Sequence, residues 1–252
     1  MSASELAERY FDSAISLLRE VRDEEAEAVA AAGALLADTV AEGGRLFAFG
    51  AGHSSLVAQD VVYRAGGLAV LNLLPVPGTV GVEVTPATLG SALEGVAGLA
   101  DAVLETSPAR SGDLLVVVSL SGRNPLPVEM ASGARERGLR VVGVTSVAYA
   151  YATRSRHPSG TFLKDHCDVV LDSRVPVGDT VLSHPGVPAP FAPASTVVAC
   201  ALLQATVATA AGELIARGLT PPLLRSGNVD GGHDWNEQVM AQHADQILYR
   251  RP

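Results

Sequence analysis

The chain has 252 residues, of which 48% are hydrophobic and 18% charged. This length predicts one large domain, or one and a half, with a sizeable buried core. The net charge of −9 excludes nucleic acid as a bulk partner, because a phosphate backbone needs a basic protein face. It does not exclude one small phosphate group, since a local set of N–H and O–H donors can bind it in an acidic protein.

Cysteine usage and hydropathy point to a cytoplasmic protein. Only Cys167 and Cys200 are present, and neither belongs to a Cys-x-x-Cys pair, which is typical of reduced thiols. Residues 1–21 are amphipathic and carry acidic side chains, unlike a signal peptide. Residues 195–211 are the most apolar stretch, but Thr and Gln interrupt it, so we expect a buried core helix and no membrane partner.

Short apolar runs alternate with helical patterns along the chain. Residues 3–42 are expected to form two helices or one bent helix, and residues 173–193 to form a Pro- and Gly-rich loop. The fully apolar run 114–120 is typical of a strand buried in a parallel sheet. Strands are expected at 45–50, 68–74, 114–120, 140–146 and 167–173. Further helices are expected at 54–66, 91–105, 125–138, 195–218 and 235–249.

This alternation predicts an α/β fold: a three-layer, doubly wound, five-stranded parallel sheet with an N-terminal helical arm and a C-terminal extension. We expect the helices of residues 1–43 to pack on the sheet domain or on a partner subunit. Residues 44–218 would form the sheet domain. Residues 219–252 would be an extension that completes the site.

Two serine-bearing turns follow apolar strand-like runs, at residues 50–55 and at residues 119–124. In an open α/β sheet, ligands bind at the carboxyl ends of the strands. Hydroxyls and backbone N–H groups at a helix start favour an anion. Helix capping would account for one serine in each turn, but not for Ser119 and Ser121 together. The two turns therefore predict one anion site with several donors.

The turns resemble the two motifs of the SIS (sugar isomerase) domain family. Gly50 to Ser54 matches its glycine-rich turn ending in serine, and Ser119 to Asn124 matches its Ser-x-Ser-Gly-x-Thr/Asn motif. The resemblance covers roughly residues 3–218. It is closest to bacterial SIS proteins with a Tyr-Arg-Ala-Gly-Gly run, here Tyr63–Gly67, while heptose-phosphate isomerases and N-acetylmuramic acid 6-phosphate lyases look more distant.

This resemblance implies a five-stranded parallel sheet that binds a phosphosugar, with the short donor side chains of both turns holding the phosphate. Gly122 would let the backbone approach the ligand closely. The helix after the first turn offers Gln59, Asp60 and Arg64 where some heptose-phosphate isomerases carry metal-binding His and Glu, so no metal and no cofactor is expected. The expected substrate- and phosphate-binding residues are Gly52, His53, Ser54, Ser55, Ser119, Ser121, Gly122 and Asn124.

Enzymes of this family mostly begin by removing a proton from the carbon next to a masked sugar carbonyl, which requires a base and an acid. We expect Glu83 as the base, because a carboxyl group between Val82 and Val84 has a raised pKa if it is buried. Asp60 could orient Arg64 or a substrate hydroxyl. Glu94 is more in keeping with a solvated or capping acid.

Histidines are the candidate acids. His53 lies beside Ser54 and is expected to contact the ligand. His233 and His243 belong to a polar C-terminal segment, and one of them is expected to complete the site, from the same chain or from a neighbouring subunit. The expected catalytic residues are thus Glu83, His243, His233 and Asp60.

The sequence therefore predicts a metal-independent enzyme for a phosphorylated amino or N-acetylamino sugar. Abstraction of the C2 proton would lead to aldose–ketose isomerisation or to β-elimination, and the sequence does not choose between them. The alternative is a phosphosugar sensor, although about 40 acidic-rich residues before the first strand are too few for a DNA-binding head. A small-molecule sugar phosphate and further copies of the chain, in a homodimer or a higher homo-oligomer, are the expected partners.

Overall fold

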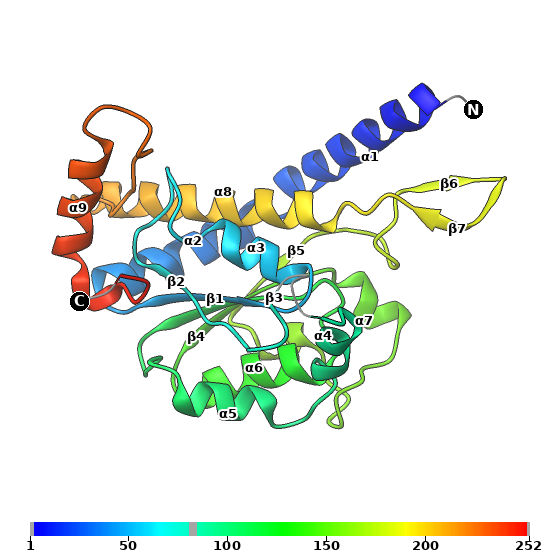
Figure 1. Cartoon of the computed structure of the whole chain (residues 1–252), viewed down its shortest axis with the longest axis horizontal. Coiled ribbons are helices and arrows are strands. Elements are labelled where there is room, and N and C mark those ends of the chain that lie inside the picture. Colours follow the sequence, from blue (N-terminus) through cyan, green and yellow to red (C-terminus); the bar gives the residue numbers. More distant parts are fainter. Residues whose placement is uncertain (1–2, 81–84, 251–252) are drawn as a thin grey trace.

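The computed structural model describes residues 3–80 and 85–250 and contains a five-stranded sheet between two layers of helices (Figure 1). All neighbouring strands of this sheet pair in parallel, in the order β2-β1-β3-β4-β5. The expected three-layer α/β fold with a five-stranded parallel sheet is confirmed. The strands are β1 (Leu46–Gly50), β2 (Leu71–Leu73), β3 (Leu114–Val118), β4 (Arg140–Thr145) and β5 (Val169–Asp172).

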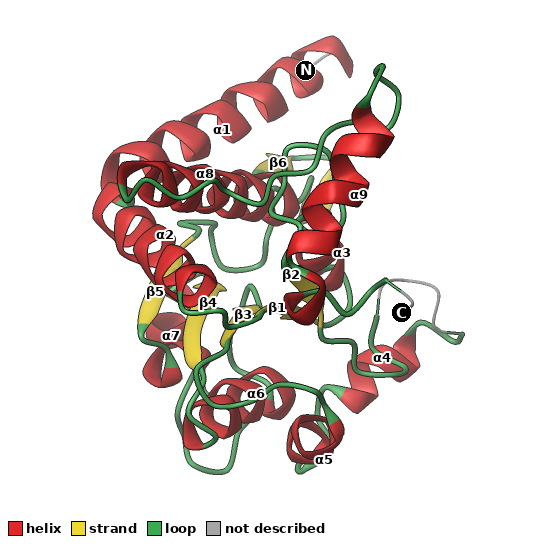
Figure 2. Ribbon diagram, turned by 90° about the vertical axis from the view of Figure 1, so that its left-hand side faces the viewer, coloured by secondary structure: helices red, strands yellow, loops and turns green. Residues whose placement is uncertain are grey.

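Helices α2 and α8 cover one face of the sheet, and α5 and α6 cover the other (Figure 2). Helix α1 projects away from the sheet beyond the end of α2 (Figure 1). The α-helices are α1 (Ala3–Glu24), α2 (Ala26–Ala41), α3 (Ser54–Asp60), α4 (Thr88–Leu93), α5 (Leu99–Thr106), α6 (Pro125–Glu136), α7 (Ala148–Ala152), α8 (Ser195–Ala216) and α9 (Gly232–Gln242). Two 3₁₀ helices are η1 (Leu163–His166) and η2 (Ala244–Gln246).

Alternating side chains of the central strands build two separate cores. In β1, Leu46 and Ala48 join the cluster under α2 and α8, whereas Phe47 and Phe49 join the cluster over α5 and α6. Every residue of β1 and β3 is buried. Burial on both faces is the reason that these strands read as continuous apolar runs instead of alternating ones.

Helix α8 is long and apolar enough to cross a membrane by length and composition alone. In the fold it packs along α2, and its buried residues belong to the main core. The two helices approach closely at Gly33, where a Cβ atom would lie 2.5 Å from Cγ2 of Thr209. The expectation of a buried core helix at this place agrees with the packing.

Three predicted helices have wrong boundaries. The single helix expected at 91–105 is two helices, because Gly98 has a φ of +80°, which no α-helix accommodates. The helix expected at 54–66 ends at Asp60, and Tyr63 beyond it has a φ of +46°. The C-terminal helix begins and ends earlier than expected, since Gly231 sets its start with a φ of +74°.

The predicted loop at 173–193 contains a β-hairpin, so this prediction is wrong. Strands β6 (Leu182–His184) and β7 (Val187–Phe191) pair antiparallel. Two prolines in β7 hid it, because proline is found in strands only at edges or bulges. The hairpin extends beyond the sheet on the same side as α1 (Figure 1), and the hydroxyl of Tyr10 donates to the carbonyl of Pro193 at 3.1 Å.

The C-terminal segment docks at the amino ends of the central strands. The amide of Gln246 donates to the carbonyl of Gly44 at 2.7 Å, and Nε of Arg45 donates to the carbonyl of Asp245 at 2.9 Å. Buried Asn72 accepts a hydrogen bond from the backbone of Leu248 at 2.7 Å. These contacts place the end of α9 at the edge of the sheet opposite the serine turns.

A buried carboxylate ties the N-terminal helices to the sheet. Glu25, between α1 and α2, is only 5% exposed. Its Oε1 accepts hydrogen bonds from Nη2 and Nε of Arg174, at 2.6 and 2.9 Å. Its Oε2 accepts one from the backbone N–H of Asp172 at 3.1 Å. One side chain therefore satisfies a guanidinium and the backbone at the end of β5.

We expect Glu25→Ala to lower the free energy of unfolding by about 2–4 kcal/mol, because the Asp172 backbone N–H loses its acceptor and Arg174 keeps only the longer contact to Asp172. Glu24→Ala, on the exposed neighbour, is the matched control and should cost less than about 0.5 kcal/mol. Urea unfolding followed by circular dichroism measures both. Equal effects of the two substitutions would show that the buried contact does not anchor the helices.

Candidate functional site

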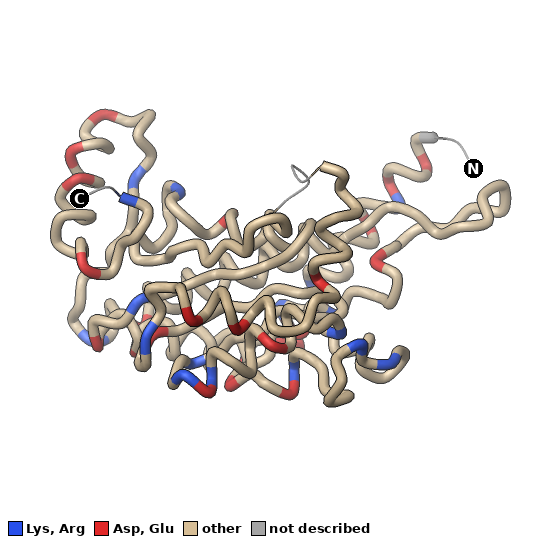
Figure 3. Tube along the Cα trace, turned by 60° about the horizontal axis from the view of Figure 1, so that its bottom comes forward, with Lys and Arg blue, Asp and Glu red and all other residues tan. Residues whose placement is uncertain are grey.

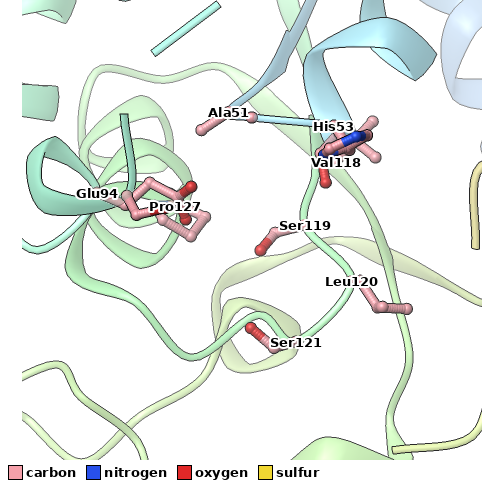
Figure 4. A pocket seen from close by; sticks show the side chains of 11 residues that line it. Ala51, His53, Glu94, Val118, Ser119, Leu120, Ser121 and Pro127 are labelled. Carbon is pink, nitrogen blue, oxygen red and sulfur yellow. The ribbon is translucent and has the colours of Figure 1, made fainter. Parts of the chain in front are cut away.

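The two serine turns meet at one edge of the sheet because β1 and β3 are adjacent and in register. Gly50 pairs with Val118 at the carboxyl ends of these strands, so the chain leaves both strands at the same level. A cavity of about 220 Å³ opens between the turns (Figure 4). Its lining comes from the two turns and from α4 and α6: Ala51, Gly52, His53, Ser54, Ser91, Glu94, Val118, Ser119, Leu120, Ser121 and Pro127.

The first turn depends on glycine at two positions. A Cβ atom at Gly50 would lie 2.3 Å from the carbonyl oxygen of Ser54, because α3 folds back over the end of β1. Gly52 has a φ of +54°, and a Cβ atom there would lie 3.6 Å from Oε1 of Glu94. Ser54 lines the cavity. Ser55 is buried and donates to the carbonyl of Gly52 at 2.7 Å, so its hydroxyl braces the turn.

The second turn presents donors without partners. Gly122 has a φ of +56°, and its N–H donates to the hydroxyl oxygen of Ser119 at 3.3 Å. Among the described residues, none accepts a hydrogen bond from the Ser121 hydroxyl or from the backbone N–H groups of Ser121 and Arg123. Figure 4 shows the Ser119 and Ser121 hydroxyls facing the hollow. Converging unpaired donors of this kind form an anion-binding concavity.

Glu94 supplies the carboxyl group of the cavity, so it is not the solvated acid that was one expectation, although it is the C-cap residue of α4, as the other expectation had it. It follows the last residue of α4, and its carboxylate faces the same hollow as the two serines (Figure 4). Partial burial raises the pKa of Glu94 above its ordinary value, against the opposing effects of Asn124 and Arg156. A carboxyl group with a raised pKa is suited to general acid–base work near neutral pH.

A chain of two hydrogen bonds connects Glu94 to the surface. The amide Nδ2 of Asn124 donates to Oε2 of Glu94 at 2.8 Å. Nη1 of Arg156 donates to Oδ1 of Asn124 at 3.3 Å. Both interactions favour the ionised form of Glu94. Asn124, the last residue of the second serine motif, thus contacts Glu94 directly and lowers its pKa.

Most of the predicted phosphate-binding residues gather at this cavity. The cavity is lined by five of them, from both turns: Gly52, His53, Ser54, Ser119 and Ser121. Gly122 and Asn124 lie in the second turn without lining it. Asp60 lies at the far end of α3, where it pairs with Arg64 and accepts a hydrogen bond from Gln204 at 2.8 Å. It orients Arg64, as one reading of the sequence expected, but it does not line the cavity.

The two C-terminal histidines lie away from the cavity of their own chain. His243 bonds to Gln246 at 2.8 Å, at the amino end of β1. The cavity is at the carboxyl end, so the five residues of β1 alone separate them by ~16 Å. His233 lines a different cavity at the start of α9. Neither histidine lines the serine cavity of its own chain.

Glu83, predicted as the base, lies outside the described residues. The sequence reasoning missed Ser91, which lines the cavity together with Glu94. Their spacing of three residues places both side chains on one face of a helical turn, and this spacing was the available signal. We missed this signal because the sequence of the region is typical of one long amphipathic helix, whereas the structure has two short helices.

Comparison with known proteins agrees with this geometry. The model of the SIS domain matches residues 9–146, which include both serine turns. A UPF0309 protein of Streptomyces avermitilis is 71% identical over 251 residues and is covered completely, as is this chain. A UPF0309 protein of Listeria innocua is 37% identical over 238 residues, with 94% of this chain and 96% of the relative covered.

Solved structures share the fold at low sequence identity. A phosphoheptose isomerase from Francisella tularensis superposes with a TM-score of 0.55 and 16% identity, covering 84% of this chain and all of that one. A phosphoheptose isomerase from Neisseria gonorrhoeae gives a TM-score of 0.54 and 18% identity, covering 84% of this chain and 98% of that one. The motif match, the full-length relatives and the sheet topology agree, and this chain belongs to the SIS domain family.

Proposed function

We propose that this chain binds a sugar phosphate between its serine turns and acts on the sugar by removing the proton at C2. One observation carries the proposal: the hydroxyls of Ser119 and Ser121 face the partly buried carboxyl group of Glu94 across one hollow. Unpaired hydroxyl and N–H donors suit phosphate oxygens, and an acid–base group suits proton transfer. The two phosphoheptose isomerases of similar fold, by their names, act on a sugar phosphate, which supports the same substrate class here.

The proposed chemistry starts from the open-chain aldehyde. A carboxylate takes the C2 proton, and the electron pair moves toward the carbonyl to give an enediolate, or its nitrogen analogue for an amino sugar. Protonation at C1 completes aldose–ketose isomerisation. Departure of the C3 substituent with a proton completes β-elimination. An acylated nitrogen at C2 blocks ordinary ketose formation, so an N-acetylamino sugar phosphate would follow the elimination branch. Neither branch needs a metal ion or a cofactor.

We assign the acid–base role in the cavity to Glu94. Glu83 remains the sequence-based prediction for a second carboxyl group. Two carboxyl groups in different surroundings would allow one to accept the C2 proton while the other protonates the departing or ring oxygen. His53 lines the cavity and is the nearest titratable neighbour of Ser54 in sequence.

A phosphosugar sensor is the second candidate. Glu94 and His53 are the only titratable side chains among the described residues that line the cavity. A binding module needs the phosphate donors alone, whereas an enzyme needs an acid and a base as well. Proton exchange at C2 separates these two functions, because a sensor binds the sugar phosphate without exchanging its protons.

We also propose that two copies of the chain associate through α1. Phe11 and Ile15 of this projecting helix are 65% and 43% exposed. An apolar groove of about 400 Å³ lies between α1, α2 and α8, with Leu18, Val29 and Leu202 in its lining. A second copy would cover this surface. Such an association would also allow His233 or His243 of one copy to approach the serine cavity of the other.

The substrate class is tested by proton NMR in D₂O with hexose, hexosamine and N-acetylhexosamine 6-phosphates. We expect loss of the C2 proton signal for one of them, together with a ketose or an unsaturated product. Ser121→Ala should weaken its binding about tenfold, because a hydrogen bond to a charged phosphate is lost. Ser183→Ala, in the exposed hairpin, is the matched control and should change nothing. Thermal stabilisation by a sugar phosphate without any exchange would establish the sensor instead.

The role of Glu94 is tested by its pH dependence. Glu94→Gln should slow C2 exchange at least about 100-fold, since no proton can be transferred to the amide. Arg156→Gln removes an interaction that favours the carboxylate, so the pKa of Glu94 rises further. A base must be ionised, and the acid limb of kcat/KM should therefore move to higher pH. Arg154→Gln, on an exposed neighbour, is the control. An unmoved acid limb in Arg156→Gln would contradict this coupling.

Association is tested by sedimentation velocity of the wild-type chain and of Phe11→Asp. We expect the wild type to sediment as a dimer or larger species, and the variant to shift toward the monomer as a carboxylate enters the apolar contact. Asp12→Asn, on the same turn, should leave the distribution unchanged. A monomeric wild type at tens of micromolar protein would refute the proposed association.

A further inference from the structure

A second cavity, of about 250 Å³, lies between the turn after α3 and the start of α9. The Tyr63–Gly67 run, which the serine cavity does not use, forms one wall: Tyr63, Arg64 and Ala65 line it. The opposite wall is the segment from Leu224 to Asn236. Backbone hydrogen bonds join the walls, from Gly66 N–H to the Leu224 carbonyl at 2.8 Å and from Leu224 N–H to the Gly67 carbonyl at 3.0 Å.

The lining of the second cavity is basic in an acidic protein. Arg64, Arg225 and His233 line it, none of the described lining residues is acidic, and the nearest carboxylate contact is the ion pair of Asp60 with Arg64. Figure 3 shows basic and acidic segments side by side near the C-terminal end of the chain, so the basic character belongs to the lining of the cavity and not to the whole region. A local excess of cationic donors within a hollow favours an anion.

The donors of this cavity are largely unpaired. The Arg225 guanidinium stacks over the Trp235 ring, 4.0 Å from its centroid, and no described residue accepts a hydrogen bond from it. Stacking fixes its plane while leaving its N–H groups available. Arg64 uses only Nη1, toward the carbonyl and carboxylate of Asp60, so Nε and Nη2 remain. No described residue bonds to the ring of His233, and a Cβ atom at Gly227 would lie 2.9 Å from Cε1 of this ring.

Backbone and side-chain contacts hold these donors in place. Asn236 braces the segment by accepting from Arg225 N–H at 2.8 Å and donating to its carbonyl at 2.9 Å. Tyr63, with a φ of +46°, is a bulky residue in the left-handed region, which persists only where the surroundings enforce it. Its exposed ring packs against Tyr249, with centroids 5.0 Å apart. The wall that carries Arg64 is therefore fixed from both sides.

We propose that this second cavity is a separate binding site for a small phosphate-bearing molecule. Two guanidinium groups on opposite walls suit a phosphate, which accepts paired hydrogen bonds from arginine. The volume accommodates a phosphate with a sugar-sized remainder, and the Tyr63 ring at the wall offers an apolar face for it. The site is distinct from the serine cavity, which lies at the other end of α3.

The test is isothermal titration with two probes, inorganic phosphate and glucosamine 6-phosphate, on a chain whose serine cavity is disabled by Ser54→Ala and Ser121→Ala. We expect one remaining binding event. Adding Arg225→Gln to this background should weaken it at least about tenfold, through loss of charge-assisted hydrogen bonds. Adding Arg154→Gln instead, on an exposed arginine outside the cavity, should leave it within about twofold.

Arg64→Gln in the same background is the second variant, because Arg225→Gln also removes a contact to Trp235. Binding lost with both arginine variants, at unchanged melting temperature, confirms the site. Equal affinities for the two probes identify free phosphate as the ligand, and tighter binding of the sugar phosphate identifies a phosphorylated metabolite. Absence of binding in the serine background, or binding unchanged by both arginine variants, overturns the proposal. Neither result alters the C2 exchange test, which uses the serine cavity.

Discussion

The parallel pairing of β1 with β3 is the constraint on which the site depends. It sets Gly50 opposite Val118, so two turns separated by almost 70 residues of sequence leave the sheet side by side. The pairing works only because no side chain stands at Gly50, where α3 folds back within 2.3 Å of a Cβ position. The chain therefore combines two conditions, strand register and backbone clearance, to place serine hydroxyls and free N–H groups around one hollow. The helices on both faces keep the strands buried and the register fixed.

Opposing interactions act on the pKa of Glu94 in this arrangement. Its carboxylate shares the hollow with donors suited to an anion, and burial already raises its pKa. A phosphate bound beside it would add a like charge and raise that pKa further. The Asn124–Arg156 chain acts in the opposite direction, because it stabilises the carboxylate through hydrogen bonding and charge. The second serine motif thus supplies both the donors proposed for the phosphate and the hydrogen bond from Asn124 that lowers the pKa of Glu94.

The sequence predicted those parts of the molecule that local patterns control. Apolar runs located all five strands of the sheet, because strands buried on both faces consist of apolar residues. Turns of small residues located the serine cavity, because the backbone there must pass close to a helix at the carboxyl ends of the strands. It failed where a local pattern was misleading, and where contacts distant in sequence decide. The β6–β7 hairpin carries prolines that mask it, and the position of Glu94 depends on a break at Gly98 that reads as a continuous helix. The C-terminal histidines looked like site residues because nothing in their pattern reveals docking at the amino end of β1.

The charge of the donors in the serine cavity determines how strongly phosphate binding there would depend on ionic strength. The hydroxyls of Ser54, Ser119 and Ser121 and the backbone N–H of Ser121 are neutral, and no Lys or Arg is among the described residues that line the hollow. Dissolved ions screen attraction between formal charges far more than short hydrogen bonds to neutral dipoles. By this argument a phosphate in the serine cavity would be less sensitive to salt than one bound between Arg64 and Arg225. The two hollows would therefore respond differently as the salt content of their surroundings changes.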